Sequence, residues 1–104
     1  MKNEGLVQRE IQRYVESLGG VVLKTQGIKV GTPDLIGSIR VNDTVYPFAV
    51  EVKVPGKEHT LTKIQKWRIQ QWQNHGWVSF VTISPEDFKF QFEQFTGIKL
   101  DGKN

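Results

Sequence analysis

The fold of this chain is restricted first by the polar pair Asn42-Asp43, which lies between two stretches with β-strand character. The sequence predicts strands at about Asp34–Val41 and Thr44–Val54, joined by Asn42-Asp43. This pair is typical of a two-residue hairpin turn in which both residues have positive φ. Such a turn fixes the strand pairing, because Val41 then lies opposite Thr44 and Asp34 opposite Glu51.

Helices and further strands are predicted on both sides of this hairpin. Apolar periodicity and capping residues indicate helices at Lys2–Leu18 and from Lys63 to about His75, strands at Val21–Leu23 and Val78–Ile83, and a last helix that begins at Ser84-Pro85. The order is α-β-β-β-α-β-α. We therefore expect a mixed β-sheet flanked by helices, in a single α/β domain that spans residues 1–104.

Several local expectations follow from the same patterns. Pro47 indicates a bulge or an edge in the second hairpin strand, and Val21–Leu23 is expected to be a buried strand. Turns are expected at Gly27, Gly31 and Pro33, and a loose tail from Asp101. The remaining burial predictions are an apolar helix face of Phe88, Phe92 and Phe95, core positions for Trp72 and Trp77, and an exposed Trp67 at an interface.

Composition excludes some classes of function. The chain has no cysteine, so it has no disulfide, thiolate metal site or cysteine nucleophile. No apolar run approaches the roughly 20 residues that cross a bilayer, and the charged N-terminus does not look like a signal peptide. These features predict a cytoplasmic protein with no membrane partner and no organic cofactor. The net charge of +3 is weak support for a polyanionic partner.

The hairpin brings chemistry-bearing residues together. Asp34 and Glu51, directly opposed, have Cβ atoms about 5 Å apart, and two like charges there repel each other. A divalent cation such as Mg²⁺, which prefers carboxylate oxygens and water, resolves that conflict. Lys53 lies two residues beyond Glu51 and so points to the same face. An amine beside two carboxylates and a metal ion is suited to activating water and to stabilising charge on a phosphate.

These residues resemble a known motif. Gly31-Thr32-Pro33-Asp34-Leu35 followed by Val50-Glu51-Val52-Lys53 is similar to the PD-(D/E)xK motif of restriction-endonuclease-like nucleases. Glu10 in the first helix, the Gly-x-Pro-Asp-Leu form of the Asp motif, and Leu61-Thr62-Lys63-Ile64-Gln65 resemble more narrowly the VRR-NUC family, the virus-type replication-repair nucleases. The resemblance covers roughly residues 5 to 90 and suggests a phage or prophage origin, with the host cytoplasm as its place of action.

The resemblance implies a restriction-endonuclease-like core and a role for each matching residue. Asp34, Glu51 and the backbone carbonyl of Val52 hold Mg²⁺ or Mn²⁺, and Lys53 is the catalytic lysine. Glu10 holds a water of the metal site or a second metal ion, and Gln65 supports the site.

Some of these residues also have a purely structural explanation. Glu10 is able to pair with Arg13, and Thr62-x-x-Gln65 forms a capping box without any site nearby. His75 suits a helix C-terminus, whereas His59 lies in a loop where substrate is expected to pass. The candidate DNA contacts are Lys24, Lys29, Lys57, His59, Lys63 and Lys66, and each lysine taken singly is as well explained as an ordinary surface residue.

The sequence thus predicts a metal-dependent DNA endonuclease that hydrolyses phosphodiester bonds. Because one domain of 104 residues has little surface for grasping a duplex, we expect a homodimer that resolves branched DNA such as four-way junctions. Two alternatives remain. One is a nicking or structure-blind nuclease with the same site, and the other is a non-catalytic DNA-binding module.

Overall fold

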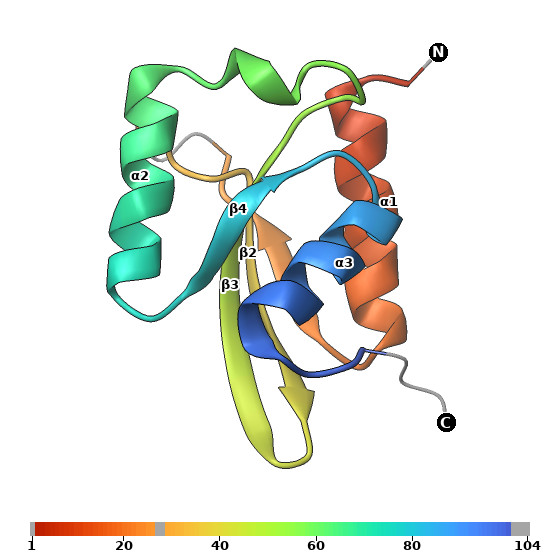
Figure 1. Ribbon diagram of the computed structural model, residues 1–104. Coiled ribbons are helices and arrows are strands. Elements are labelled where there is room, and N and C mark those ends of the chain that lie inside the picture. Colours follow the sequence, from red (N-terminus) through yellow and green to blue (C-terminus); the bar gives the residue numbers. More distant parts are fainter. Residues whose placement is uncertain (1, 27–28, 101–104) are drawn as a thin grey trace.

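The computed structural model describes residues 2–26 and 29–100. The expected turn at Gly27 and the expected loose tail from Asp101 lie outside these residues. A four-stranded sheet in the order β1-β2-β3-β4 forms the centre of the fold. Helices α1 and α3 cover one face of the sheet and α2 packs on the other (Figure 1). This arrangement confirms the predicted mixed α/β architecture.

The elements follow the predicted order, with small shifts at their ends. They are α1 (Glu4–Ser17), β1 (Val21–Lys24), β2 (Leu35–Val41), β3 (Thr44–Val52), the 3₁₀ turn η1 (Glu58–Thr60), α2 (Lys63–Asn74), β4 (Val78–Thr82) and α3 (Pro85–Thr96). The strands β1, β2 and β3 pair antiparallel, whereas β4 runs parallel to β3. The crossover from β3 to β4 carries α2, as a parallel connection requires.

The β2–β3 hairpin has the predicted turn and register. Asn42 and Asp43 have φ values of 51° and 70°, and Val41 pairs with Thr44. The register stays constant as far as the pair of Leu35 and Val50, so the expected bulge at Pro47 is absent. Pairing with β4 starts only one residue after Pro47. The alternative expectation of an edge is therefore correct, because β3 has no second neighbour at that residue.

The core lies between the sheet and the α1/α3 layer. Phe48 of β3 contacts Phe88 and Phe92 of α3 edge to face, with ring centroids 5.2 and 6.5 Å apart. All three side chains are fully buried. The other fully buried apolar side chains of this layer are Val7, Ile11, Val15, Leu35, Ile39, Val50 and Val52. Burial at this density holds β2 and β3 rigidly and so fixes the ends from which the polar residues project.

The prediction that Val21–Leu23 is a buried strand is wrong. Val21 and Leu23 are 64% and 52% exposed, because β1 is an edge strand that pairs only with β2. Phe95 is 50% exposed and stacks on Phe80 at the border of the core, with ring centroids 5.5 Å apart.

The tryptophans are less buried than expected. Trp72 and Trp77 are partly exposed and pack edge to face against each other, 4.5 Å apart, instead of entering the core. Trp67 is 53% exposed, as predicted, with the Arg68 guanidinium 4.9 Å from its ring centroid.

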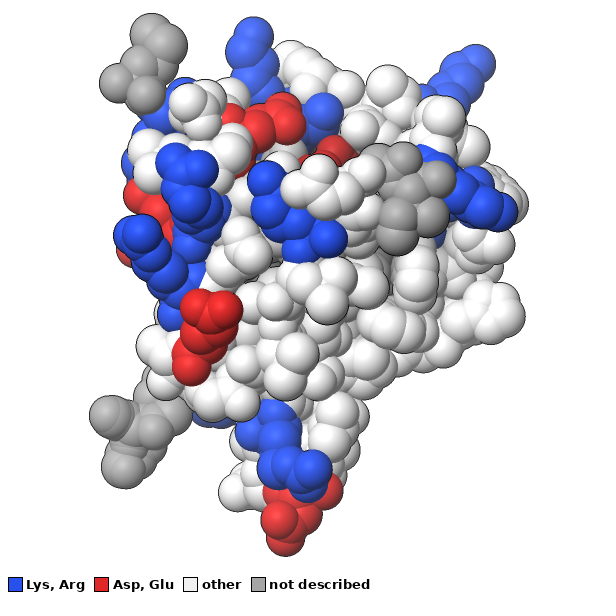
Figure 2. All heavy atoms as spheres, turned by 180° about the vertical axis from the view of Figure 1, so that it is seen from behind, with Lys and Arg blue, Asp and Glu red and all other residues white. Residues whose placement is uncertain are grey.

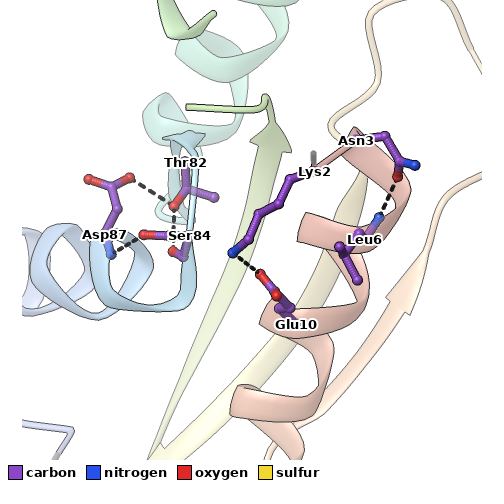
Figure 3. Close-up of polar contacts among 7 residues, drawn as sticks. All are labelled: Lys2, Asn3, Leu6, Glu10, Thr82, Ser84 and Asp87. Atoms are coloured by element: carbon purple, nitrogen blue, oxygen red, sulfur yellow. Dashed lines mark hydrogen bonds and ion pairs between the residues drawn. The ribbon is translucent and has the colours of Figure 1, made fainter. Parts of the chain in front are cut away.

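Side-chain caps define where the helices begin. Asn3, Thr62 and Ser84 each accept a hydrogen bond from a backbone N–H of the first turn that follows. Ser84 accepts from the N–H of Asp87, whose carboxylate in turn accepts from the Thr82 hydroxyl at the end of β4 (Figure 3). Across residues 2–26 and 29–100, no helix is both long and apolar enough to span a bilayer.

Candidate functional site

Asp34 and Glu51 converge where β2 begins and β3 ends. Leu35 and Val50 form the last paired residues of the ladder, and Asp34 and Glu51 come directly beyond them. The Asp34 carboxylate crosses to β3, where its Oδ2 accepts a hydrogen bond of 2.8 Å from the backbone N–H of Val52. The hairpin register therefore brings the two carboxylates together, as the turn geometry predicts.

The Glu51 carboxylate is buried, which makes its ionisation unfavourable. Only 3% of the residue is exposed, and Oε1 is buried without a hydrogen-bond partner. Burial, and after it the neighbouring Asp34 carboxylate, together raise the pKa of Glu51 from 4.5 to about 8. A buried carboxyl group beside a second one is costly to ionise unless a cation shares the site.

Gln65 contacts Glu51 directly. Its Nε2 donates a hydrogen bond of 3.0 Å to Glu51 Oε2, while its Oε1 accepts 2.9 Å from the N–H of Thr62. The capping box at the start of α2 is thus present, and the same side chain also reaches the carboxylate. The structural and the site explanation of Gln65 are compatible, since the cap fixes the amide in the orientation that Glu51 needs.

Lys53 follows the end of β3 and is partly buried. Its backbone N–H donates a hydrogen bond of 3.0 Å to the carbonyl of Thr82, which extends the pairing with β4 by one residue. The Lys53 ammonium group lowers the pKa of Glu51, although burial and Asp34 outweigh it.

Helix α1 carries Glu10, whose expected role at the metal site stays a prediction. Glu10 Oε1 pairs with Lys2 Nζ at 2.9 Å (Figure 3). The residues of α1 on the site side are Glu4, whose charge raises the pKa of Glu51, and Gln8. Glu4 and Gln8 are one turn apart on the same helix face, whereas Glu10 is rotated by about 200° from Gln8.

Sequence reasoning missed both Glu4 and Gln8. A detectable signal was the spacing of Gln8, Ile11 and Val15, which places Gln8 on the buried stripe more securely than Glu10. Gln8, and not Glu10, is the residue of α1 that lines the cavity with Asp34 and Glu51.

A cavity of about 430 Å³ opens over the two carboxylates. Asp34, Glu51, Gln65 and Gln8 line it, together with Lys24 and Lys29 from the predicted set of DNA contacts. The other members of that set are exposed and do not line it: Lys57, His59, Lys63 and Lys66. The arrangement is an acidic centre with lysines at its border.

The oxygen atoms of this centre fit a hard divalent cation. Glu51 Oε1 is buried without a partner, and Asp34 supplies a second carboxylate beside it. Within the described part of the chain, no group of three or more His, Cys, Asp or Glu side chains is placed to hold a metal ion. Mg²⁺ commonly binds through one or two carboxylates and keeps several waters, so a site of this composition suits it.

Comparison with known proteins gives a likeness of fold. No protein-family model matches the chain, and no curated protein matches it. Among solved structures, a "VRR_NUC domain protein" superposes with a TM-score of 0.67 over 95% of this chain and 92% of the other, at 19% sequence identity. The chain therefore has the fold of a VRR_NUC domain protein, as the sequence motifs predict.

Proposed function

We propose that this protein is a metal-dependent endonuclease that hydrolyses phosphodiester bonds in DNA. The observation that carries the proposal is the pair of neighbouring carboxylates, Asp34 and Glu51, which line a cavity together with lysine side chains. The likeness of fold to a VRR_NUC domain protein supports it, because that name denotes a nuclease domain.

Asp34 and Glu51, with the backbone carbonyl of Val52, are the groups that would hold Mg²⁺ or Mn²⁺. When bound, such an ion lowers the pKa of water and polarises the scissile phosphate. The chain's own residues prepare this arrangement. The N–H of Val52 fixes Asp34, and the Gln65 amide fixes Glu51 through Oε2, while Glu51 Oε1 has no hydrogen-bond partner.

Lys53 is the residue proposed to stabilise the negative charge that develops during the reaction. The effect of its charge on the pKa of Glu51 supports a position near the carboxylates. From there it orients the attacking water and stabilises the negative charge that develops on the phosphate oxygens. We propose no such role for Glu10, whose carboxylate pairs with Lys2 outside the cavity.

The DNA strand is proposed to reach the carboxylates past Lys24 and Lys29. Both residues line the cavity, and their side chains are suited to neutralising phosphates on either side of the scissile bond. Figure 2 shows Lys and Arg side chains gathered around acidic atoms in the upper part of one face of the molecule. The net charge of +3 favours the same polyanionic partner.

Within this activity we propose that the protein resolves branched DNA, such as four-way junctions, as a homodimer. Two-fold symmetry would place two sites on two strands of one junction. The edge strand β1 supports a dimer, because the exposed side chains of Val21 and Leu23 lie on a strand with an unpaired edge. A nicking or structure-blind nuclease would use the same catalytic groups.

Cleavage of labelled four-way junction, flap and linear duplex DNA with Mn²⁺ tests the proposal. We expect the wild type to cut the junction best, and Asp34→Ala and Lys53→Ala to lose cutting of every substrate. Arg40→Ala, on the exposed side of β2, is the matched control and keeps full activity. Undiminished cutting by either site variant removes the residue assignment. Equal cutting of all three substrates instead favours the structure-blind alternative.

A further inference from the structure

The side chain of Gln8 is buried with an unused hydrogen-bond acceptor. Gln8 lies on α1 next to Val7, and only 8% of it is exposed. Its Oε1 has no hydrogen-bond partner. A buried polar atom without a partner destabilises the fold, and an apolar side chain at this position would avoid that cost. The packing of α1 therefore does not explain why a glutamine stands at position 8.

The location of Gln8 supplies that explanation. Its side chain lines the same cavity as Asp34 and Glu51. Glu51 Oε1 is likewise buried and without a hydrogen-bond partner. The two residues that carry these oxygens, one on a helix and one on a strand, therefore line one cavity of about 430 Å³. An occupant that accepts electron pairs from both would satisfy them.

The chemistry of these oxygens selects a hard cation over other occupants. An amide oxygen, like a carboxylate oxygen, is a ligand of Mg²⁺ and Ca²⁺ in proteins. The described residues bring no third acidic or histidine side chain into a metal-binding group with Asp34 and Glu51. A neutral oxygen donor from α1 adds to such a site without adding to the repulsion between the two carboxylates.

We propose that Gln8 Oε1 is a further oxygen donor of the metal site, holding the divalent cation or a water in its shell. This inference rests on the proposed function, because it assumes the cation that Asp34 and Glu51 would bind. It assigns to α1 a positioning residue that differs from Glu10. The charge of Glu10 is taken up by Lys2 outside the cavity.

Calorimetric titration of the full chain with Mn²⁺, without DNA, tests the proposal. The test variant is Gln8→Met, which keeps the length of the side chain and removes the amide. We expect its Mn²⁺ affinity to fall by about 10-fold or more, as is typical when a group that supports a metal is removed. In EDTA we expect a higher melting temperature than for the wild type, because the unpartnered oxygen is gone.

Gln8→Glu and Glu10→Gln complete the design. Gln8→Glu keeps an oxygen at the same reach, so it retains Mn²⁺ binding at wild-type strength or better. Its melting temperature in EDTA falls because a third carboxylate is added. Glu10→Gln, on the same helix, leaves Mn²⁺ affinity unchanged.

The outcomes separate this inference from the proposed function. If the wild type binds Mn²⁺ and Gln8→Met binds it equally well, Gln8 is not a donor and the inference is overturned. The inference is also overturned if Gln8→Glu loses as much Mn²⁺ affinity as Gln8→Met does. If the wild type itself binds no Mn²⁺, the metal-dependent function fails first and takes this inference with it.

Discussion

The Asp34 carboxylate accepts a hydrogen bond of 2.8 Å from the backbone N–H of Val52, across the open end of the β2–β3 hairpin. This contact makes Asp34 a structural as well as a chemical residue, because Val52 is fully buried and its N–H has no access to water. Asn at this position retains an oxygen acceptor without the charge, whereas Ala leaves the N–H without an acceptor.

We therefore predict that Asp34→Ala and Asp34→Asn are both inactive but differ in stability. Asp34→Ala unfolds at lower denaturant concentration, with a difference of about 1–3 kcal/mol for the unsatisfied N–H. Urea unfolding in EDTA, followed by circular dichroism, measures the difference. Asp43→Asn, in the exposed hairpin turn, serves as the control for loss of one carboxylate. Equal stability of the two Asp34 variants would show that the contact with Val52 does not contribute.

The hairpin shows how much of the site was predictable from sequence. Asn42-Asp43 admits few turn types, and a two-residue turn fixes every pair along both strands, including the approach of Asp34 to Glu51. Gln65 was predictable for a similar reason, since Thr62 sets where α2 begins and hence where the amide points. In both cases a few neighbouring residues, in a turn or in a helix cap, determine where the site side chains lie.

The errors arise where tertiary packing decides. A three-residue apolar run such as Val21–Leu23 looks the same in a central strand and at an edge, and only the sheet order distinguishes them. Glu10 and Gln8 both lie near the apolar stripe of α1, and their roles depend on the angle at which α1 packs on the sheet. Neither the sheet order nor that angle is encoded in a local pattern.

The raised pKa of Glu51 predicts that this residue lowers the stability of the metal-free protein at high pH. The folded protein binds this proton more tightly than the unfolded chain does, since its pKa rises from 4.5 to about 8. Without metal, stability contributed by the protonated group is fully present below pH 4.5 and is lost as the pH rises through about 8. Glu51→Gln removes this loss and is expected to be inactive.

In EDTA, Glu51→Gln should melt at a higher temperature than the wild type at pH 8.5. The difference in unfolding free energy is on the order of a few kcal/mol and shrinks towards zero near pH 4.5. Mn²⁺ should raise the melting temperature of the wild type and not that of the variant. Scanning calorimetry across this pH range gives both results. A gain that is independent of pH would contradict the assignment to the Glu51 proton.

Lys24 and Lys29 are predicted to contact DNA phosphates directly. Replacing either by Ala should weaken binding to all DNA substrates alike, and should reduce the slope of log Kd against log salt concentration by about 1. Fluorescence anisotropy of labelled DNA in Ca²⁺ gives the slope. Lys99→Ala is the control, since Lys99 is exposed near Glu93 and away from the cavity. A slope unchanged in both site variants would place the DNA elsewhere.

Glu93 of α3 is predicted to fasten the C-terminal segment over the core. Its Oε2 accepts a hydrogen bond of 2.8 Å from the N–H of Leu100, and that bond, together with Lys89 and Lys99, holds the pKa of Glu93 below its usual value of 4.5. Leu100 is only 2% exposed, so the bond keeps an apolar side chain in place.

A carboxylate with a lowered pKa stabilises the fold above pH 4.5, and this contribution is lost as the pH falls through the lower pKa of the folded state. Glu93→Gln should therefore melt a few degrees below the wild type at pH 7, and the two should approach each other as the pH falls towards 3. Glu16→Gln, on the exposed side of α1, should show no such difference at either pH. Melting curves of the three proteins at several pH values test this prediction. If Glu93→Gln melts as far below the wild type at pH 3 as at pH 7, its lower melting temperature comes from lost packing and not from the lost charge.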